Sequence, residues 1–133
     1  MEIQIINIPK IINSKGNIGV IEHDTIPFDI KRVYYLYDVP SSAKRGGHAH
    51  KNLQQLLIPL SGSFDVVLKD GNEEVTITLN KPDKGLLINN NTWRELENFS
   101  SGAVCMVLAS HIYTESDYIR NYDDFLEYIK TNK

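Results

Sequence analysis

The stretch that decides the class of fold is Ser63-Phe-Asp-Val-Val-Leu-Lys69, followed by Asp70-Gly71 and then by Glu74-Val-Thr-Ile-Thr-Leu79. Apolar and polar side chains alternate in the second run, as they do in a strand with one buried and one solvated face. An Asp-Gly pair between two such runs is a typical hairpin turn. The stretch therefore predicts two antiparallel strands joined by a tight turn.

Similar short runs recur along the rest of the chain, separated by turn residues such as Ser61-Gly62 and Ser101-Gly102. Short strands at this spacing are typical of a β-sandwich or barrel. The expected strands are Ile3–Ile8, Ile18–Glu22, Lys31–Asp38, Leu53–Leu60, Ser63–Lys69, Glu74–Leu79, Gly85–Ile88, Thr92–Asn98 and Ala103–Ala109.

Only the C-terminal segment changes to a helical period, with Thr114 or Ser116 as the expected N-cap. We expect this helix to pack on the barrel or on a partner subunit. The sequence thus predicts one all-β domain over residues 1–133, a β-barrel or jelly roll with a short C-terminal α-helix. The apolar stripe of that helix is Tyr118, Tyr122, Phe125, Leu126 and Ile129.

Composition and charge exclude several classes of protein. Of the 133 residues, 41% are hydrophobic and 23% are charged, which is ordinary for a globular domain. The net charge of −3 argues against nucleic acid as a partner, because phosphate backbones are bound by basic faces. One phosphorylated small molecule remains compatible with it, held by a few Arg and Lys side chains.

The single cysteine, Cys105, lies in the apolar run Ala103–Ala109, so we expect a buried thiol rather than a nucleophile. No stretch approaches the ~20 apolar residues of a membrane span. The first residues show no signal peptide. We therefore expect no membrane partner and a cytoplasmic location.

The segment Arg45-Gly-Gly-His48-Ala-His50-Lys51 carries the clearest chemistry in the chain. Two residues apart on a strand, both imidazoles point to the same side. The glycines let backbone come close to a ligand, and the flanking Arg45 and Lys51 favour a functional site. From the pattern alone, the pair could bind a metal, transfer protons or lie in a satisfied polar patch.

A metal site would need more ligands than these two histidines, since stable sites use three or four. Metal-binding barrels of the cupin type place a Glu about four residues after His-x-His and a further His on a later strand. Here the first position holds the neutral Gln54 and the second holds Arg94, whose charge repels a divalent cation. We therefore expect no metal and no other cofactor.

Proton transfer is the stronger alternative, because an imidazole titrates near neutral pH and can take a proton from carbon. A second imidazole can share or relay that proton, and Arg45 or Arg94 can stabilise negative charge or hold a phosphate. This combination suits removal of a proton beside a carbonyl through an enediolate. The expected strand at Lys31–Asp38 adds three tyrosines, and one that turned inward could donate a hydrogen bond to a sugar or carbonyl oxygen.

Several segments together resemble the sugar nucleotide 3,4-ketoisomerases that act on dTDP-4-oxo-6-deoxyglucose. They span nearly the whole chain in order: Ile26–Tyr35, Arg45–Lys51, Trp93-Arg-Glu-Leu-Glu97, Val107–Ser110 and Glu115–Tyr122. The resemblance implies a cupin fold of the dTDP-sugar epimerase type. It also implies a metal-free isomerase that moves the carbonyl from C4 to C3 through an enediol, in deoxyamino-sugar biosynthesis for a surface polysaccharide.

The resemblance further implies roles for individual residues. His48 corresponds to the favoured base, His50 to the residue that assists or relays, and Tyr34 to an active-site phenol. The arginine that contacts substrate corresponds to Arg45. We expect Arg32, Lys51 and Arg94 to complete the substrate-binding set. Members are homodimers with exchanged N-terminal strands, and the apolar start Ile3–Ile8 is compatible with that.

Two departures from the family pattern lie near the expected pocket. Well-known members have Trp-His-Glu where this chain has Trp93-Arg94-Glu95, and Gly-Pro where it has residues 89–91, all asparagine. These changes leave the configuration at C4 of the product open. Three other functions stay open as well: a sugar nucleotide epimerase on the same fold, a non-catalytic sugar nucleotide binding module and a metal-dependent cupin.

Overall fold

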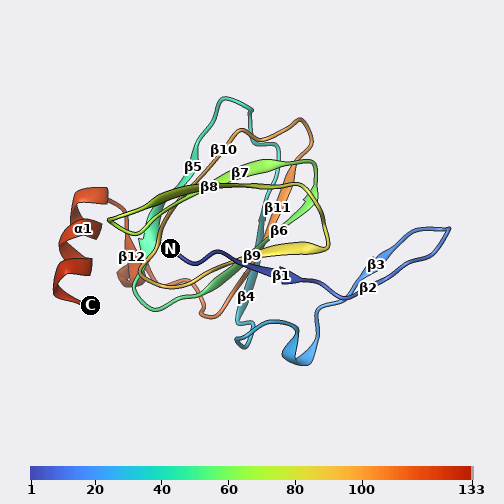
Figure 1. Ribbon diagram of the computed structural model, residues 1–133, viewed down its shortest axis with the longest axis horizontal. Helices are drawn as coiled ribbons and strands as arrows, with labels where there is room; N and C mark the ends of the chain where they lie inside the picture. The colour runs from blue at the N-terminus through green and yellow to red at the C-terminus, as the bar shows by residue number, and fades with distance from the viewer. Residues whose placement is uncertain (133) are drawn as a thin grey trace.

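Two five-stranded antiparallel sheets form the body of the molecule (Figure 1). The computed structural model describes residues 1–132. Sheet I consists, in spatial order, of β1 (Gln4–Asn7), β9 (Lys84–Ile88), β6 (Gln55–Ser61), β11 (Val104–Ala109) and β4 (Arg32–Leu36). Sheet II consists of β12 (Tyr118–Ile119), β5 (Arg45–His50), β10 (Trp93–Glu97), β7 (Phe64–Lys69) and β8 (Glu74–Leu79). Neighbouring strands come mostly from distant parts of the chain, as in a jelly roll.

The expected jelly roll with a C-terminal helix is therefore confirmed, with two separate sheets in place of one continuous ring of strands. Helix α1 spans Tyr122–Thr131, and short 3-10 turns occur at His23–Thr25 (η1) and Glu115–Asp117 (η2). β2 (Lys10–Ile11) and β3 (Ile18–Gly19) pair only with each other. This hairpin projects from the body at the end opposite α1 (Figure 1).

The hairpin predicted from the opening stretch is present as β7 and β8, paired from Phe64↔Leu79 to Lys69↔Glu74. Its turn depends on Asp70, whose side chain accepts hydrogen bonds from the backbone N–H groups of residues 72 and 73 at 2.9 and 2.8 Å. Gly71 follows at φ +96°, and a Cβ there would lie 2.6 Å from the Ile129 side chain of α1. The turn therefore needs glycine both for its conformation and for close contact with the helix.

Apolar side chains from the inner faces of both sheets form the main core, which includes Phe64, Val66, Leu86 and Val107. Cys105 belongs to this core with none of its surface exposed, and burial raises the pKa of its thiol to about 12. The expectation of a buried, unreactive thiol is confirmed. Three members of this core, Leu57, Leu96 and Val107, also line the cavity between the sheets.

The expected start of the C-terminal helix was wrong. Tyr118 is not on the helix but in β12, where it pairs with His50 of β5. Neither Thr114 nor Ser116 caps α1, because that role belongs to Asn121, whose side chain accepts a hydrogen bond from the Asp124 N–H at 3.1 Å. Pairing with a sheet edge overrides the helical spacing of the side chains. The rest of the stripe packs on sheet II, against Trp93 and Ala49.

The N-terminal strand pairs within its own chain: β1 lies antiparallel to β9, with Ile5 opposite Leu86. The strand predicted at Ile18–Glu22 is shorter in the structure, where β3 spans only Ile18–Gly19.

None of the helices in residues 1–132 is long and apolar enough to cross a membrane.

Candidate active site

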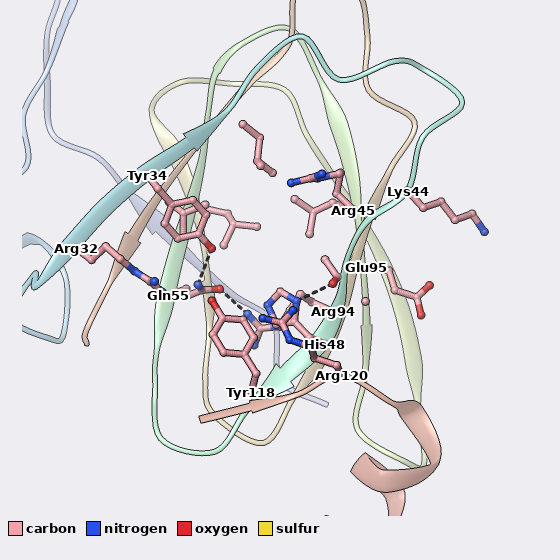
Figure 2. A pocket seen from close by; sticks show the side chains of 16 residues that line it. Arg32, Tyr34, Lys44, Arg45, His48, Gln55, Arg94, Glu95, Tyr118 and Arg120 are labelled. Carbon is pink, nitrogen blue, oxygen red and sulfur yellow. Dashed lines mark hydrogen bonds between the residues drawn. The ribbon is translucent and has the colours of Figure 1, made fainter. Parts of the chain in front are cut away.

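A cavity of about 820 Å³ opens between the two sheets, within the size range of small-molecule sites. Sheet I lines it with Arg32, Tyr34, Leu36, Gln55, Leu57 and Val107. Sheet II lines it with residues 45–48, Arg94, Glu95, Leu96 and Tyr118, and Lys44 and Arg120 complete the wall. Figure 2 shows Tyr34 and Gln55 on one side facing His48 and Arg94 on the other.

Strand pairing decides which face of β4 turns inward. Tyr34 lies opposite Val107, and Arg32 lies opposite Ala109, which in turn lies opposite Gln55 of β6. Arg32, Tyr34 and Gln55 therefore share the inner face of sheet I. Tyr35 and Tyr37 point outward, each with 61% of its surface exposed.

A β-bulge places His48 beside Arg94. Arg94 pairs with His48 while the next residue of β10, Glu95, pairs with Gly46, so Gly47 is an extra residue in β5. Gly47 has φ +53°, and Gly46 has φ +85° with Arg94 O only 3.2 Å from where its Cβ would be. The glycines thus serve the bulge, not only the approach of a ligand as expected from the sequence. Bulges of this kind re-aim a side chain next to an active site.

His48 is a neutral imidazole with one nitrogen free. Its Nδ1 lies 2.7 Å from Gly46 O, which can only accept, so Nδ1 carries the proton. Its Nε2 is buried without a hydrogen-bond partner among the described residues. Burial, and secondarily the charge of Arg94, lowers the pKa of His48 to about 4. At neutral pH, Nε2 therefore presents a lone pair on a side chain that lines the cavity.

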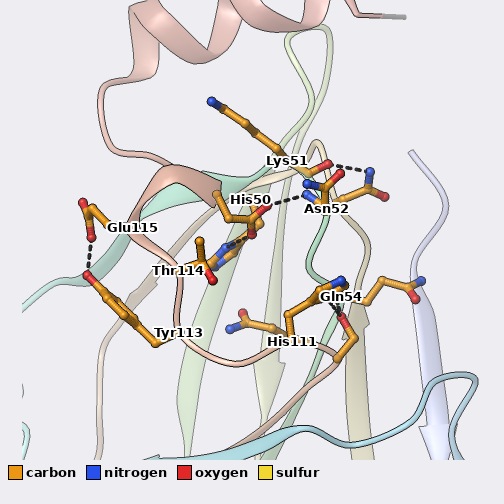
Figure 3. A network of polar contacts seen from close by, with 12 residues as sticks. His50, Lys51, Asn52, Gln54, His111, Tyr113, Thr114 and Glu115 are labelled. Atoms are coloured by element: carbon orange, nitrogen blue, oxygen red, sulfur yellow. Dashed lines mark hydrogen bonds and ion pairs between the residues drawn. The ribbon is translucent and has the colours of Figure 1, made fainter.

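His50 lies behind His48, fully buried and outside the cavity lining. Its ring is edge-on to that of His48, with the centroids 4.8 Å apart. Its Nδ1 donates to Asp117 at 3.0 Å, and the other oxygen of Asp117 accepts from the Asn52 N–H at 2.8 Å (Figure 3). Burial, followed by the charge of Arg94, lowers the pKa of His50 to about 3. Asp117 thus fixes the tautomer and orientation of His50.

Arg94 is a buried guanidinium that takes part in none of the ion pairs of residues 1–132. It donates to Gln55 Oε1 at 2.5 Å and to Thr92 O at 3.1 Å. Burial lowers its pKa to about 10, which still leaves it charged at neutral pH. A buried cation without a counter-ion is costly for stability, so its presence points to an anion that arrives with a ligand.

Further basic side chains line the cavity. Arg32 has two buried guanidinium nitrogens without hydrogen-bond partners among the described residues. Arg120 is held by Glu115 through two hydrogen bonds of 2.7 and 2.9 Å, and its guanidinium lies 4.2 Å from the centre of the Tyr118 ring. With Lys44 and Arg45 the lining holds five basic side chains, counting Arg94, against the single carboxylate of Glu95. The cavity therefore suits an anionic ligand.

Of the residues expected from the sequence, the structure brings Tyr34, His48, Arg32, Arg45 and Arg94 to the cavity. It does not bring Lys51 there. The Lys51 ammonium lies 5.7 Å from the centre of the Tyr128 ring on α1 instead. Lys51 follows β5 at the end remote from the bulge, so its side chain meets the helix and not the cavity.

Four residues that the sequence analysis did not single out as site residues belong to this region: Gln55, Asp117, Tyr118 and Arg120. The segment Glu115–Tyr122 carried a signal, since it is part of the family resemblance. Because its apolar side chains have helical spacing, Tyr118 was predicted on the C-terminal helix, whereas it lies in β12. The place of Asp117 beside His50 depends on β12 pairing with β5, 67 residues away in the chain, which no local pattern reveals.

The position of Gln54 needs correction. Its side chain donates to Asn89 at 2.8 Å and lies outside the cavity lining, whereas the next residue, Gln55, faces the histidines. The residue at the place of a third metal ligand is therefore Gln55, which is neutral as well. Within residues 1–132 no three His, Cys, Asp or Glu side chains come close enough together to hold a metal ion.

Comparison with known proteins assigns the chain to a family. The family model FdtA, described as WxcM-like, C-terminal, matches residues 1–130. The TDP-4-oxo-6-deoxy-α-D-glucose-3,4-oxoisomerase of Aneurinibacillus thermoaerophilus is 51% identical over 130 residues, covering 97% of this chain and 94% of the relative. This chain belongs to the sugar nucleotide 3,4-ketoisomerase family. It is thus an enzyme of that class.

Solved members of the sugar nucleotide 3,4-ketoisomerase family share its fold closely. The 3,4-ketoisomerase of Helicobacter canadensis is 46% identical, with a TM-score of 0.94 and 98% of each chain covered. A histidine-to-asparagine mutant of the Thermoanaerobacterium thermosaccharolyticum 3,4-ketoisomerase QdtA has been solved with TDP-4-keto-6-deoxyglucose. It is 44% identical, with a TM-score of 0.95 and coverage of 98% of this chain and 95% of that one.

Proposed function

We propose that this enzyme moves the keto group of dTDP-4-oxo-6-deoxyglucose from C4 to C3, with His48 as the base. The observation that carries the proposal is the neutral imidazole of His48, whose unpartnered Nε2 lies on a cavity lined with cations. The Aneurinibacillus thermoaerophilus relative is named for this sugar nucleotide, and the QdtA mutant was solved with it bound. Both the chemistry of the cavity and the family therefore support the same substrate.

In the proposed reaction, Nε2 of His48 removes the proton from C3, which is acidic because it lies next to the C4 carbonyl. The electron pair passes to the C4 oxygen and forms an enediolate. The C3 hydroxyl gives up its proton and becomes the new carbonyl, the C4 oxygen takes up a proton and becomes a hydroxyl, and a proton is added at C4. No atom is gained or lost overall. The proton that His48 takes exchanges with solvent before a proton is delivered to C4, and His50 assists or relays that transfer.

The charge that develops on the substrate oxygens needs a partner in the cavity. Arg94 supplies a fixed positive charge, and the Tyr34 hydroxyl supplies a hydrogen bond. Because burial raises the pKa of Tyr34, its phenol stays protonated at neutral pH. Arg32 and Arg45, together with Lys44 and Arg120, are the residues that we propose hold the diphosphate.

The decisive experiment is turnover of dTDP-4-oxo-6-deoxyglucose in deuterated water, followed by NMR of the product. We expect a ketone at C3 and deuterium at C4. Deuterium at C3 or C5 with the ketone still at C4 would identify an epimerase instead. Tight binding without exchange would identify a binding module. The same spectrum reports the configuration at C4.

A chelator provides a control for the proposal that the enzyme uses no metal. Turnover should be unchanged after incubation with EDTA, because the proposed steps need only the side chains of the cavity. Loss of turnover that zinc or iron restores would show a metal-dependent enzyme.

The pH dependence of kcat/KM should report the low pKa of His48. Since the base works in its neutral form and its pKa is about 4, kcat/KM is expected to stay flat between about pH 5.5 and 8. A base with the ordinary pKa of ~6.5 would lose roughly tenfold at pH 5.5. Initial rates in buffers of constant ionic strength test this, and an inflection near pH 6.5 would contradict the assignment.

We further propose that the enzyme works in the cytoplasm and supplies a keto sugar to deoxyamino-sugar synthesis.

We also propose that the enzyme is a homodimer with exchanged N-terminal strands. The exposed Ile11, Ile12 and Ile18 of the projecting β2–β3 hairpin support the dimer, since isolated apolar hairpins gain stability from a partner. In a dimer, β1 would occupy the same edge beside β9 of the other subunit. A molar mass of one chain by light scattering would contradict this.

A further inference from the structure

Gln55 connects Arg94 to Tyr34 in the wall of the cavity (Figure 2). Only 2% of Gln55 and 1% of Arg94 is exposed, so water does not compete for their polar atoms. Arg94 Nη1 donates to Gln55 Oε1 at 2.5 Å, and Gln55 Nε2 donates to Tyr34 Oη at 2.9 Å. The three side chains come from three different strands, β10, β6 and β4.

The direction of both hydrogen bonds follows from the chemistry of the groups. A guanidinium has donors and no acceptor, so the carbonyl oxygen of Gln55 must face Arg94. The amide nitrogen is then left to face Tyr34, and it can only donate. Because Arg94 is also bound to Thr92 O at 3.1 Å, the guanidinium cannot swing away and release the amide. The amide is therefore held in one orientation.

This orientation determines where the phenol proton of Tyr34 lies. The Tyr34 oxygen accepts from Gln55, so its own O–H is not used in that contact and is free for a ligand in the cavity. We propose that Gln55 is a positioning residue that holds the Tyr34 hydroxyl as a hydrogen-bond donor to the substrate oxygen. The inference rests on the proposed function, in which that oxygen gains negative charge.

A purely structural role for Gln55 makes a different prediction. If the side chain served only to satisfy Arg94, a glutamate would serve better, because it would form an ion pair with the buried guanidinium. A glutamate carboxylate, however, has no proton to donate to Tyr34. It would accept the phenol proton instead and turn it away from the substrate. The two roles are therefore separated by a change of one atom.

The test is Gln55→Glu alone and combined with Tyr34→Phe. We expect Gln55→Glu to lower kcat about 100-fold, within the range for loss of one hydrogen-bond donor to a developing oxyanion. KM and the affinity for TDP should change little, because the diphosphate is held elsewhere. In the Tyr34→Phe background the same change should lower kcat much less, since no hydroxyl is left to position and only the new ion pair with Arg94 still acts on the developing charge.

Gln54→Glu is the matched control, since it adds the same charge one residue away, outside the cavity lining. It should leave kcat unchanged. If Gln55→Glu does not fold, Gln55→Met serves in the same pair of backgrounds, because it also removes the donor to Tyr34. Two results would overturn the inference: a kcat of Gln55→Glu within twofold of the wild type, or losses that multiply in the double variant. An inactive wild type would instead refute the proposed function.

Discussion

Replacing His48 with Asn is expected to lower turnover about 10³-fold while the protein stays folded. The imidazole is the group on the cavity wall with a free basic nitrogen at neutral pH, and Asn cannot take its place as a base. Asn can still donate a hydrogen bond to Gly46 O in the bulge, as His48 does. The loss should therefore fall on kcat, not on the fold or on substrate affinity.

The His48 measurement combines three readings. Exchange of the substrate proton at C3 into deuterated water reports the base directly, TDP binding by calorimetry reports the intact cavity, and a thermal melt reports the fold. His111→Asn is a matched control, because His111 is exposed and bonded to Ser110 away from the cavity lining. Exchange that continues at the wild-type rate in His48→Asn would remove His48 as the base.

Replacing Arg94 with Met is expected to separate activity from stability. Loss of a fixed charge beside a developing oxyanion costs about 10²–10³-fold in kcat. The melting temperature should hold or rise, because Met has a similar length and removes a buried charge that has no ion-pair partner. The gain in stability is reduced because the Gln55 Oε1 atom loses its hydrogen-bond donor.

Arg94 also lowers the pKa of His48, second to burial, so the variant should raise that pKa toward its ordinary value. The sign is fixed by electrostatics: removing a neighbouring positive charge makes protonation easier. Titration of the His48 ring by NMR measures it. Arg94→Lys keeps the charge but lacks the planar guanidinium, whose two separate nitrogens bond Gln55 and Thr92, so an intermediate kcat is expected. Full activity in Arg94→Met, or a large fall in its melting temperature, would contradict this account.

Much of the fold was predictable because its signals are local. The hairpin at Asp70-Gly71 depends on a turn that a few neighbouring residues specify. The alternation at residues 75–79 reflects which side chains meet the core, and it holds in the structure. The prediction of the helix start was wrong for the opposite reason, since Tyr118 joins a strand through pairing with a distant segment.

The sequence predicted that the two histidines could transfer protons, but it did not predict the different surroundings of the two rings. Spacing placed both imidazoles on one side of a strand, and the structure has their rings 4.8 Å apart. Their different surroundings depend on tertiary contacts: His48 lines the cavity, while His50 is buried against Asp117. The same limit explains Gln54 and Gln55, because a difference of one residue reverses the face of a strand and only the register decides it.

The sequence by itself thus determined the jelly-roll fold, the His-x-His chemistry and, through the chain-long resemblance, the family. These depend on local period, residue type and the order of motifs along the chain. Only the tertiary structure decided which side chains share the cavity, that Gly47 is a bulge and that Arg94, Gln55 and Tyr34 form one hydrogen-bonded series. Those contacts join strands far apart in the chain, and register and burial, which no local pattern encodes, bring them together.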